Sequence, residues 1–415
     1  MEIAARKRFA DPEFHSKEYK MSQDPVVIVG MARTPMGGFQ GDLKDVPAPL
    51  LGAAAIKAAL ENAGITGDDV DEVIMGNILS AGQGQAPARQ ASIGAGVPQS
   101  VGCTTINKMC GSGMKATMFA NDLISAGTND VMVAGGMENM TRAPYLLDRA
   151  REGYRMGHGQ IKDHMFLDGL EDAYDKGALM GVFAEETARK YQFTREQQDE
   201  FAITSLNRAK TAIEDGTFDR EVTPVTVKGR KGDTVIERDE QPLKANLDKI
   251  PTLRPAFAKD GSVTAANSSS ISDGGAALVL MRRSEAEKRG LTPIAVIHGH
   301  ATHAHEPAWF TTAPGPAMEG LLEKIGWSTD DVDLFEINEA FAVVTMAAMR
   351  DLDIPHDKVN VHGGACALGH PVGASGARII ITLLAALEKY NVDKGMASLC
   401  IGGGEATAIA VERLH

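Results

Sequence analysis

Two cysteines and a histidine stand in glycine-rich segments where their side chains could carry out nucleophilic chemistry. Cys110 precedes Gly-Ser-Gly at the start of a segment with a helical pattern. A free thiol is only a few per cent ionised at pH 7, and a helix N-terminus lowers the pKa of a cysteine. We therefore expect Cys110 to be a nucleophile with a lowered pKa. The alternative is a buried packing cysteine, because most lone cysteines serve that purpose.

Three further residues could assist such a nucleophile. His370 lies in a glycine-dense turn before Pro371 and is a candidate general base. Cys400 ends an apolar run and precedes three glycines, whose N–H groups could reach a bound carbonyl. Asn338 follows another apolar run and could hold a water or a carbonyl. Each also has a structural interpretation: a core histidine, a small strand residue, and a turn or cap residue.

Other patterns do not indicate a cofactor. No dinucleotide or Walker glycine motif occurs, and the histidine-rich segment lacks a fixed third ligand, so we expect no metal site. Cys103 and Cys366 are expected to be packing residues. The histidines of that segment are His298, His300, His303 and His305.

The elements that must position these residues come in two similar sets. ENAGITGDDVDEVIMGNI from Glu61 matches EKIGWSTDDVDLFEINEA from Glu323, and SGMK from Ser112 matches SGAR from Ser375. AGGME from Ala134 matches IGGGE from Ile401, in the same order and at nearly the same separation. Such a repeat predicts two similar α/β halves, which could bring the turns of Cys110 and His370 together.

Short apolar runs alternate with helical patterns in both halves, which favours mostly parallel sheets covered by helices. The expected strands are 26–35, 70–75 and 131–134, then 294–297, 332–337 and 397–401. The expected helices are 49–64 and 113–126, then 317–325 and 376–389. The predicted organisation is an N-terminal extension (1–24), a first half (25–140 plus 261–292), an inserted domain (141–260) and a second half (293–415).

Composition narrows the class of protein. The chain has 415 residues, 43% hydrophobic and 23% charged, which is typical of a folded protein of two or three domains. No apolar run is long enough to span a membrane. A net charge of −13 without a block of basic residues argues against a nucleic-acid-binding protein. Four cysteines without a Cys-x-x-Cys pair indicate free thiols, so we expect a cytoplasmic location. The first 20 residues lack a signal core.

From about Pro25 to His415 the chain resembles the thiolases, which transfer acyl groups between coenzyme A thioesters. The resemblance rests on INKMCGSG around Cys110, NEAFA from Asn338, GGACALGHPVGASGAR around His370, and CIGGG from Cys400. It implies a five-layer αβαβα fold with an inserted loop domain that binds coenzyme A.

The resemblance also implies a ping-pong mechanism. Cys110, deprotonated by His370, would take the acyl group, and Cys400 would act as base on a second acyl-coenzyme A or protonate the leaving carbanion in thiolysis. One oxyanion site would use His370 with a water held by Asn338, and the other the N–H groups of Cys110 and Gly402.

Coenzyme A and acyl-coenzyme A would be substrates, and no cofactor is expected. The protein would be a homodimer or homotetramer that binds neither nucleic acid nor membrane. The expected coenzyme A contacts are Leu170, Met180, Lys244, Ala265, Ser269, Ala340 and Phe341.

Several positions depart from the short-chain thiolase pattern. Leu179 replaces a histidine, Trp309 and Phe310 replace a Met-Gly region, and Glu405 replaces a small residue after CIGGG. Leu179 adds apolar surface, so we expect acceptance of four-carbon and somewhat longer ketoacyl chains unless the two rings close the pocket.

Three other functions remain open at this stage. A ketoacyl-synthase-like condensing enzyme shares the fold but lacks the second cysteine before the glycines, so Cys400 discriminates against it. A Cys–His thioester hydrolase would release free acid. A non-catalytic binding protein would form no acyl-enzyme.

Overall fold

The computed structural model describes residues 24–415, so the extension expected over 1–24 lies, apart from Asp24, outside the described residues. A 10-stranded mixed sheet runs in the order β12-β13-β14-β11-β1-β10-β5-β3-β4, and β2 (Gly37–Gly38) pairs with β10. Its first-half strands are β1 (Val26–Arg33), β3 (Glu72–Gly76), β4 (Gly102–Ile106), β5 (Val131–Asn139) and β10 (Ser272–Arg282). Its second-half strands are β11 (Ala295–Ala304), β12 (Leu334–Ile337), β13 (Lys394–Ile401) and β14 (Glu405–Arg413).

The two halves meet where β1 pairs briefly with β11, with Val27 opposite Val296. On both sides of this joint, antiparallel and parallel strand pairings follow in the same order. Two antiparallel pairings come first, β1–β10–β5 and β11–β14–β13, and then a parallel pairing, β5–β3 and β13–β12. This mirrored order confirms the two similar α/β halves.

The expectation of mostly parallel sheets is wrong. Among the described strands of the large sheet, β3–β4, β3–β5 and β12–β13 are parallel, and the other pairings are antiparallel. One reason is that β13 and β14 form a hairpin, whose turn contains Gly403 and Gly404 at φ of 96° and 89°. Glycine adopts this left-handed region without steric cost. The other reason is β10, a strand that the sequence patterns did not predict, which returns from the insert beside β5.

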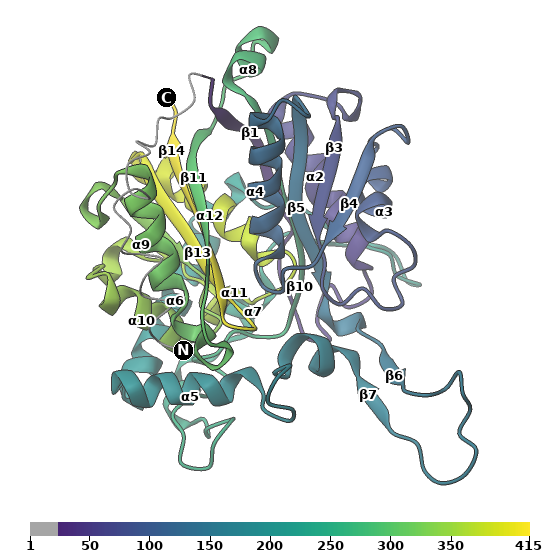
Figure 1. Ribbon diagram of the computed structural model, residues 1–415, viewed down its shortest axis with the longest axis vertical. Coiled ribbons are helices and arrows are strands. Elements are labelled where there is room, and N and C mark those ends of the chain that lie inside the picture. The colour runs from purple at the N-terminus through teal and green to yellow at the C-terminus, as the bar shows by residue number, and fades with distance from the viewer. Residues whose placement is uncertain (1–23) are drawn as a thin grey trace, which may run out of the picture.

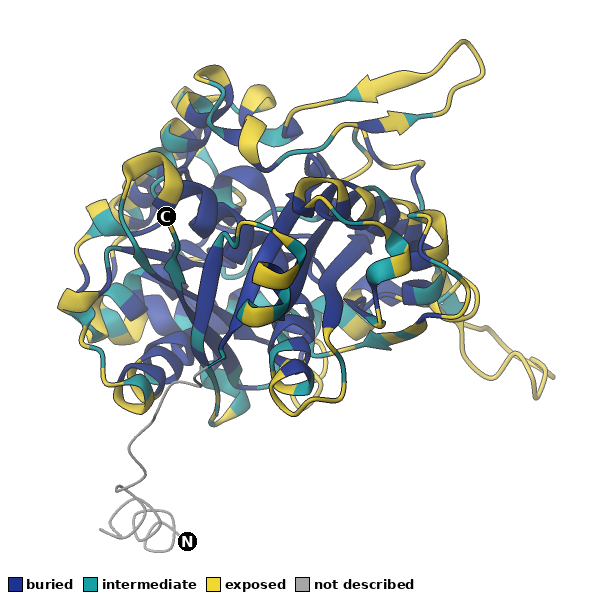
Figure 2. Cartoon of the chain, turned by 90° about the horizontal axis from the view of Figure 1, so that it is seen from above, coloured by how far each residue is buried: buried dark blue, intermediate teal, exposed yellow. Residues whose placement is uncertain are grey.

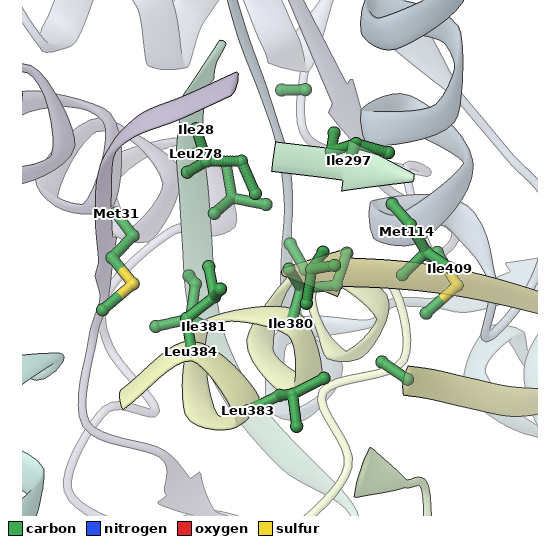
Figure 3. Close-up of a cluster of buried hydrophobic side chains, with 14 of the residues drawn as sticks. Ile28, Met31, Met114, Leu278, Ile297, Ile380, Ile381, Leu383, Leu384 and Ile409 are labelled. Atoms are coloured by element: carbon green, nitrogen blue, oxygen red, sulfur yellow. The ribbon is translucent and has the colours of Figure 1, made fainter. Parts of the chain in front are cut away.

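Helices complete five layers, as Figure 1 shows. The first half is covered on its outer face by α2 (Ala48–Ala63) and α3 (Pro87–Gly94), and the second by α9 (Pro314–Ile325) and α10 (Ala342–Asp351). The middle layer contains α4 (Ser112–Ser125) and α12 (Ser375–Tyr390), which contact strands of both halves. Figure 3 shows this central core, where Met114 of α4 and Ile380 of α12 lie near Ile28, Leu278 and Ile409 of the sheet.

The two middle helices approach backbone to backbone at their N-terminal ends. A Cβ added to Gly376 would lie 2.3 Å from the backbone nitrogen of Met114, and one added to Gly113 would lie 2.8 Å from that of Ala377. Real Cβ atoms do not come this close, so glycine is required at both positions. Since the turns before these helices carry Cys110 and His370, this contact places the two candidate catalytic turns beside each other.

The insert packs against one end of this framework. It contains η4 (Phe166–Leu170), α5 (Met180–Tyr191), α6 (Arg195–Glu214), α7 (Glu240–Lys244) and the two-stranded sheets β6–β7 (Tyr145–Leu147, Ile161–Asp163) and β8–β9 (Val225–Val227, Thr234–Ile236). Figure 2 shows mostly buried strands in the centre, and Figure 1 shows the β6–β7 hairpin projecting from the body. Within residues 24–415, no helix combines the length and apolar character needed to cross a membrane.

Candidate active site

The turn that carries Cys110 has an unusual backbone. Met109 has φ of 47°, in the left-handed region that costs free energy for a residue other than glycine. The turn is held from both sides: the N–H of Met109 donates to Oδ1 of Asn107 (3.0 Å), and that of Lys108 donates to Oγ of Ser112 (2.8 Å). The turn therefore presents Cys110 directly before α4.

The thiol of Cys110 is not acidified in the free protein. Burial raises its pKa to about 11, although the N–H groups of Gly402 and of Cys110 itself act in the opposite direction. The expectation of a lowered pKa is therefore wrong, because loss of solvent outweighs the helix end. A base must take the proton before the sulfur can attack a thioester.

His370 is nearly fully buried, at 5% exposure, in the turn before α12. The backbone N–H of His370 donates to the carbonyl of Ser270 and to Oγ of Ser272, both at 3.2 Å. Burial, assisted by the charge of Arg378, lowers the pKa of the ring to about 3. The imidazole is therefore neutral at physiological pH, which is the state a general base requires.

Asn338 and Cys400 come from the ends of two parallel neighbours, β12 and β13. The side-chain nitrogen of Asn338 lies 3.5 Å from Nε2 of His370. The backbone N–H of Asn338 donates to the carbonyl of Ser398 at 3.0 Å. Cys400 is buried, and its pKa is raised well above the usual range by burial and by the neighbouring Cys110. The structure thus brings together all four side chains that the sequence singled out.

Gly402 is also drawn into this site. Its N–H donates to the Cys110 thiol, so this N–H and that of Cys110 point toward the same atom. A Cβ at this position would lie 3.7 Å from the sulfur of Met180, which places Met180 over the glycine turn. Two convergent N–H groups beside a thiol can stabilise an oxyanion that forms on a bound thioester.

Four other expected coenzyme A contacts lie around the same site. The N–H of Ser269 donates to the carbonyl of Ala340 at 2.9 Å, and Phe341 pairs with the preceding Ser268 as a β-bridge. Phe341 and Met180 pack in the apolar cluster that contains Cys400. Leu170 packs in the cluster that Cys110 borders.

The remaining two, Lys244 and Ala265, line a cavity of about 330 Å³ between the insert and the turn of His370. Ser270, whose carbonyl accepts from His370, lines it too. The ammonium of Lys244 is already paired with Glu240 and with Asp42, at 3.3 Å from the latter. Part of its charge is therefore already balanced by these two carboxylates.

Glu138 was missed by the sequence interpretation. Its buried carboxylate accepts from the N–H groups of Ile78 (2.9 Å), Leu79 (3.2 Å) and Gly373 (3.1 Å). It therefore links a loop of the first half to the turn that follows His370. Burial raises its pKa to about 7, and its charge opposes ionisation of Cys110. The repeat match of Glu138 with Glu405 was the one available signal.

Glu405 holds the opposite side of the site. Its carboxylate pairs with Lys108, two residues before Cys110, so an ion pair joins the nucleophile turn to the segment after Cys400. The departure from a small residue at this position therefore creates a link between the two thiol-bearing turns.

The rings of Trp309 and Phe310, which replace the Met-Gly region of short-chain thiolases, lie in different environments. Phe310 is 3% exposed and packs edge to face against Phe183 in the cluster that contains Cys400. Trp309 faces α5 instead, with Nζ of Lys190 at 4.2 Å from the ring centroid. Of the two rings, only that of Phe310 therefore belongs to the cluster that contains Cys400.

Three of the four clustered histidines lie in β11 and His305 directly follows it, and their rings make other contacts. His300 lies 2.9 Å from Asp122, and His303 lies 3.3 Å from His305. His305 donates to the carbonyl of Trp309 at 2.7 Å. Within the part of the chain that the structure describes, no three His, Cys, Asp or Glu side chains are grouped to hold a metal ion.

Comparisons with known proteins agree with this geometry. Residues 26–284 match the family model of the thiolase N-terminal domain, and residues 291–413 match that of the thiolase C-terminal domain. The acetyl-CoA acetyltransferase of Cupriavidus necator is 50% identical over 94% of this chain and 99% of its own. Acetyl-CoA acetyltransferase 2 of Arabidopsis thaliana is 50% identical over 96% of this chain and 100% of its own.

A solved structure shares the whole architecture. The crystal structure of the Bacillus anthracis acetyl-CoA acetyltransferase superimposes with a TM-score of 0.92 at 41% identity, and the match covers 95% of this chain and 100% of that one. With the family models, the relatives and this fold in agreement, the chain belongs to the thiolase family.

Proposed function

We propose that this protein transfers acetyl groups between coenzyme A thioesters through an acyl-enzyme on Cys110. As a thiolase it is an acyltransferase that acts on acyl-coenzyme A. The restriction to acetyl groups is supported by the relatives, which are acetyl-CoA acetyltransferases, and by Phe310, which occupies the apolar cluster that contains Cys400.

The observation that carries the proposal is the proximity of a second thiol to a thiol that faces two N–H groups. Cys110 accepts from its own N–H and from that of Gly402, and it lies close enough to Cys400 to raise the pKa of the Cys400 thiol. Two thiols with separate roles suit a reaction of two covalently distinct steps, because one must bind the acyl group while the other moves a proton.

In the first step the Cys110 proton passes to Nε2 of His370, and the sulfur attacks the thioester carbonyl. Coenzyme A leaves as its thiolate and takes the proton from His370. In the second step the Cys400 thiol first gives its proton to His370, and the Cys400 thiolate removes a proton from the α-carbon of acetyl-coenzyme A. The resulting carbanion attacks the acyl-enzyme and releases Cys110 as a thiolate, which takes the proton back from His370. The reverse sequence is thiolysis of a 3-ketoacyl-coenzyme A. No cofactor enters either step.

The condensing-enzyme alternative is not favoured. Cys400 lies beside Cys110, where an enzyme of that class has no second thiol, and the similar curated proteins are acetyltransferases. A thioester hydrolase would have no use for a second buried thiol at the acyl site.

The test is mass spectrometry after incubation with acetyl-coenzyme A. One acetyl group should be found on the Cys110 peptide, and Cys110→Ala should carry none, with Cys103→Ala as the matched control that stays labelled. Label on another cysteine of the wild type, with Cys110 unmodified, would overturn the mechanism. Release of acetate without a ketoacyl product would favour the hydrolase.

A homotetramer is the assembly we propose. β4 is one of the two edge strands of the large sheet. It is partly exposed, so it offers unpaired backbone groups to a second copy of the chain. The projecting β6–β7 hairpin exposes Tyr145 and Ile161, each at 67%. Apolar side chains on a projecting arm are typical of subunit contacts. Light scattering should show four copies, and Ile161→Asp should lower that number.

The proposed location is the cytoplasm, and the proposed role lies in the metabolism of fatty acids or short ketoacyl thioesters. All four cysteines are free thiols, including the two in the active site, which a reducing compartment would preserve. Fractionation of the source cells tests the location.

A further inference from the structure

The two middle helices begin with serines that occupy equivalent positions in the repeat. Ser112 starts α4 and Ser375 starts α12, and both are fully buried. Each hydroxyl lies near a carbonyl of the turn before its helix. Oγ of Ser112 is 2.7 Å from the carbonyl of Met109, and Oγ of Ser375 is 3.0 Å from that of Pro371.

The second partner of each hydroxyl belongs to a catalytic turn. For Ser112 it is the N–H of Lys108, which can only donate, so the hydroxyl hydrogen of Ser112 must go to Met109. For Ser375 it is Nδ1 of His370, at 2.6 Å. If Ser375 follows the arrangement of its counterpart, its hydrogen goes to Pro371 and its oxygen accepts from Nδ1–H.

The opposite side of the ring gives an independent indication. The side-chain nitrogen of Asn338 faces Nε2 of His370 at 3.5 Å, and an amide nitrogen can only donate. Nε2 must then be the acceptor, without a hydrogen. A neutral imidazole carries one hydrogen, so both sides of the ring place it on Nδ1.

We propose that Ser375 is a positioning residue that holds His370 in the Nδ1–H tautomer, so that Nε2 carries no hydrogen and can accept the proton of Cys110. The proposal rests on the proposed acyl transfer, because it assigns His370 as the base of that reaction. After proton transfer both ring nitrogens carry hydrogen, and Ser375 still accepts from Nδ1–H. The bond therefore also stabilises the imidazolium that exists before coenzyme A takes the proton.

Thr117 provides the matched control, because Ser112 itself holds the turn of Cys110. Thr117 is fully buried in α4, and its hydroxyl donates to the carbonyl of Gly113 at 3.1 Å. Thr117→Val and Ser375→Ala each remove one fully buried hydroxyl from a middle helix, but only Ser375→Ala removes the acceptor of the base. Neither change touches the charged groups that act on the pair, Arg378 near His370 and Glu138 near Cys110. Both changes should lower the thermal stability, and only Ser375→Ala should alter the reactivity of the thiol.

The experiment is alkylation of Cys110 by iodoacetamide between pH 6 and 10, with the modified peptide quantified by mass spectrometry. Wild type and Thr117→Val should react at neutral pH with a shallow pH dependence. Ser375→Ala should react at least tenfold more slowly at pH 7. Its alkylation rate should then increase about tenfold per pH unit, as that of an unassisted thiol does. A Ser375→Ala profile that matches the wild-type profile would overturn the proposal.

A second measurement needs no variant at position 375. Proton–nitrogen correlation spectra of 15N-histidine-labelled protein distinguish the two tautomers, and His370→Gln identifies the signal. An Nδ1–H pattern supports the proposal, and an Nε2–H pattern contradicts it. If alkylation behaves as expected but acetyl-coenzyme A does not label Cys110, the proposed function fails while the role of Ser375 stands.

Discussion

The side-chain nitrogen of Asn338 lies 3.5 Å from Nε2 of His370, although Asn338 directly follows β12 and His370 precedes α12. Both backbones are anchored independently: Asn338 donates to the carbonyl of Ser398, and His370 donates to that of Ser270. Two strands and a helix end thus fix the relationship, and the pair can face a substrate oxygen without reorganising.

The first prediction concerns the double role of His370 as base and oxyanion donor. His370→Ala should slow both acylation and condensation at least 100-fold, because one side chain serves both half-reactions. Rapid-quench measurement of coenzyme A release gives the first rate, and steady-state turnover gives the second. His158→Ala, on the exposed hairpin, is the control. A rate within a few-fold of wild type for either half-reaction would contradict the double role.

The second prediction separates the two thiols. Cys400→Ser should still acquire an acetyl group on Cys110 but should lose at least 1,000-fold in condensation and thiolysis, because an alcohol is a far weaker base than a thiolate. Acetyl label by mass spectrometry and ketoacyl turnover are measured on the same sample. Near-normal turnover of Cys400→Ser would show that another group is the base.

The third prediction concerns acyl length and revises the expectation drawn from Leu179. Since Phe310 packs beside Cys400, kcat/KM should fall at least tenfold from four-carbon to six-carbon ketoacyl substrates. Phe310→Leu should reduce that discrimination, whereas Trp309→Leu should leave it unchanged, because the Trp309 ring faces Lys190. If the wild type accepts both lengths equally, Phe310 does not close the pocket.

The fourth prediction tests the contact between the middle helices. Gly376→Ala places a Cβ 2.3 Å from the backbone nitrogen of Met114 and should lower the free energy of unfolding by about 3 kcal/mol or more. Gly320→Ala is the matched control: this helical glycine of α9 has no atom within 4 Å of the added Cβ. It should gain up to about 1 kcal/mol. Denaturant melts of the two variants should therefore shift in opposite directions.

The fifth prediction concerns acid stability and His362. Neither ring nitrogen of this buried histidine has a hydrogen-bond partner among residues 24–415, and burial lowers its pKa to about 4. Below the unfolded value of 6.5 the unfolded chain gains a proton that the folded protein does not take until about pH 4. The wild type should therefore lose up to about 3 kcal/mol through this group between pH 6.5 and 4.

His362→Phe lacks that loss, so its free energy of unfolding relative to wild type should rise as the pH falls through this window. Denaturant titrations at pH 7 and pH 4.5 give the comparison. A difference between the two proteins that is the same at both pH values would show that the folded-state pKa is not depressed.

Local sequence was sufficient to predict the candidate catalytic segments and the two halves. Cys110, Asn338, His370 and Cys400 were recognisable because glycine-rich turns and helix starts depend on residues near in the chain. The repeat around Ser112 and Ser375 reported the symmetry that places α4 against α12. Strand β10 escaped prediction, and with it the antiparallel majority, because its partners depend on a return from the insert.

The tertiary structure alone decided the electrostatic state of the site. Cys110 has a raised pKa rather than a lowered one, since segments distant in the chain partly bury it. The pairing of Lys244 with Asp42 and the inward position of Phe310 likewise depend on remote neighbours. A sequence determines which groups are present and in what order, but desolvation and side-chain partners are properties of the packed molecule, because they depend on residues that only folding brings together.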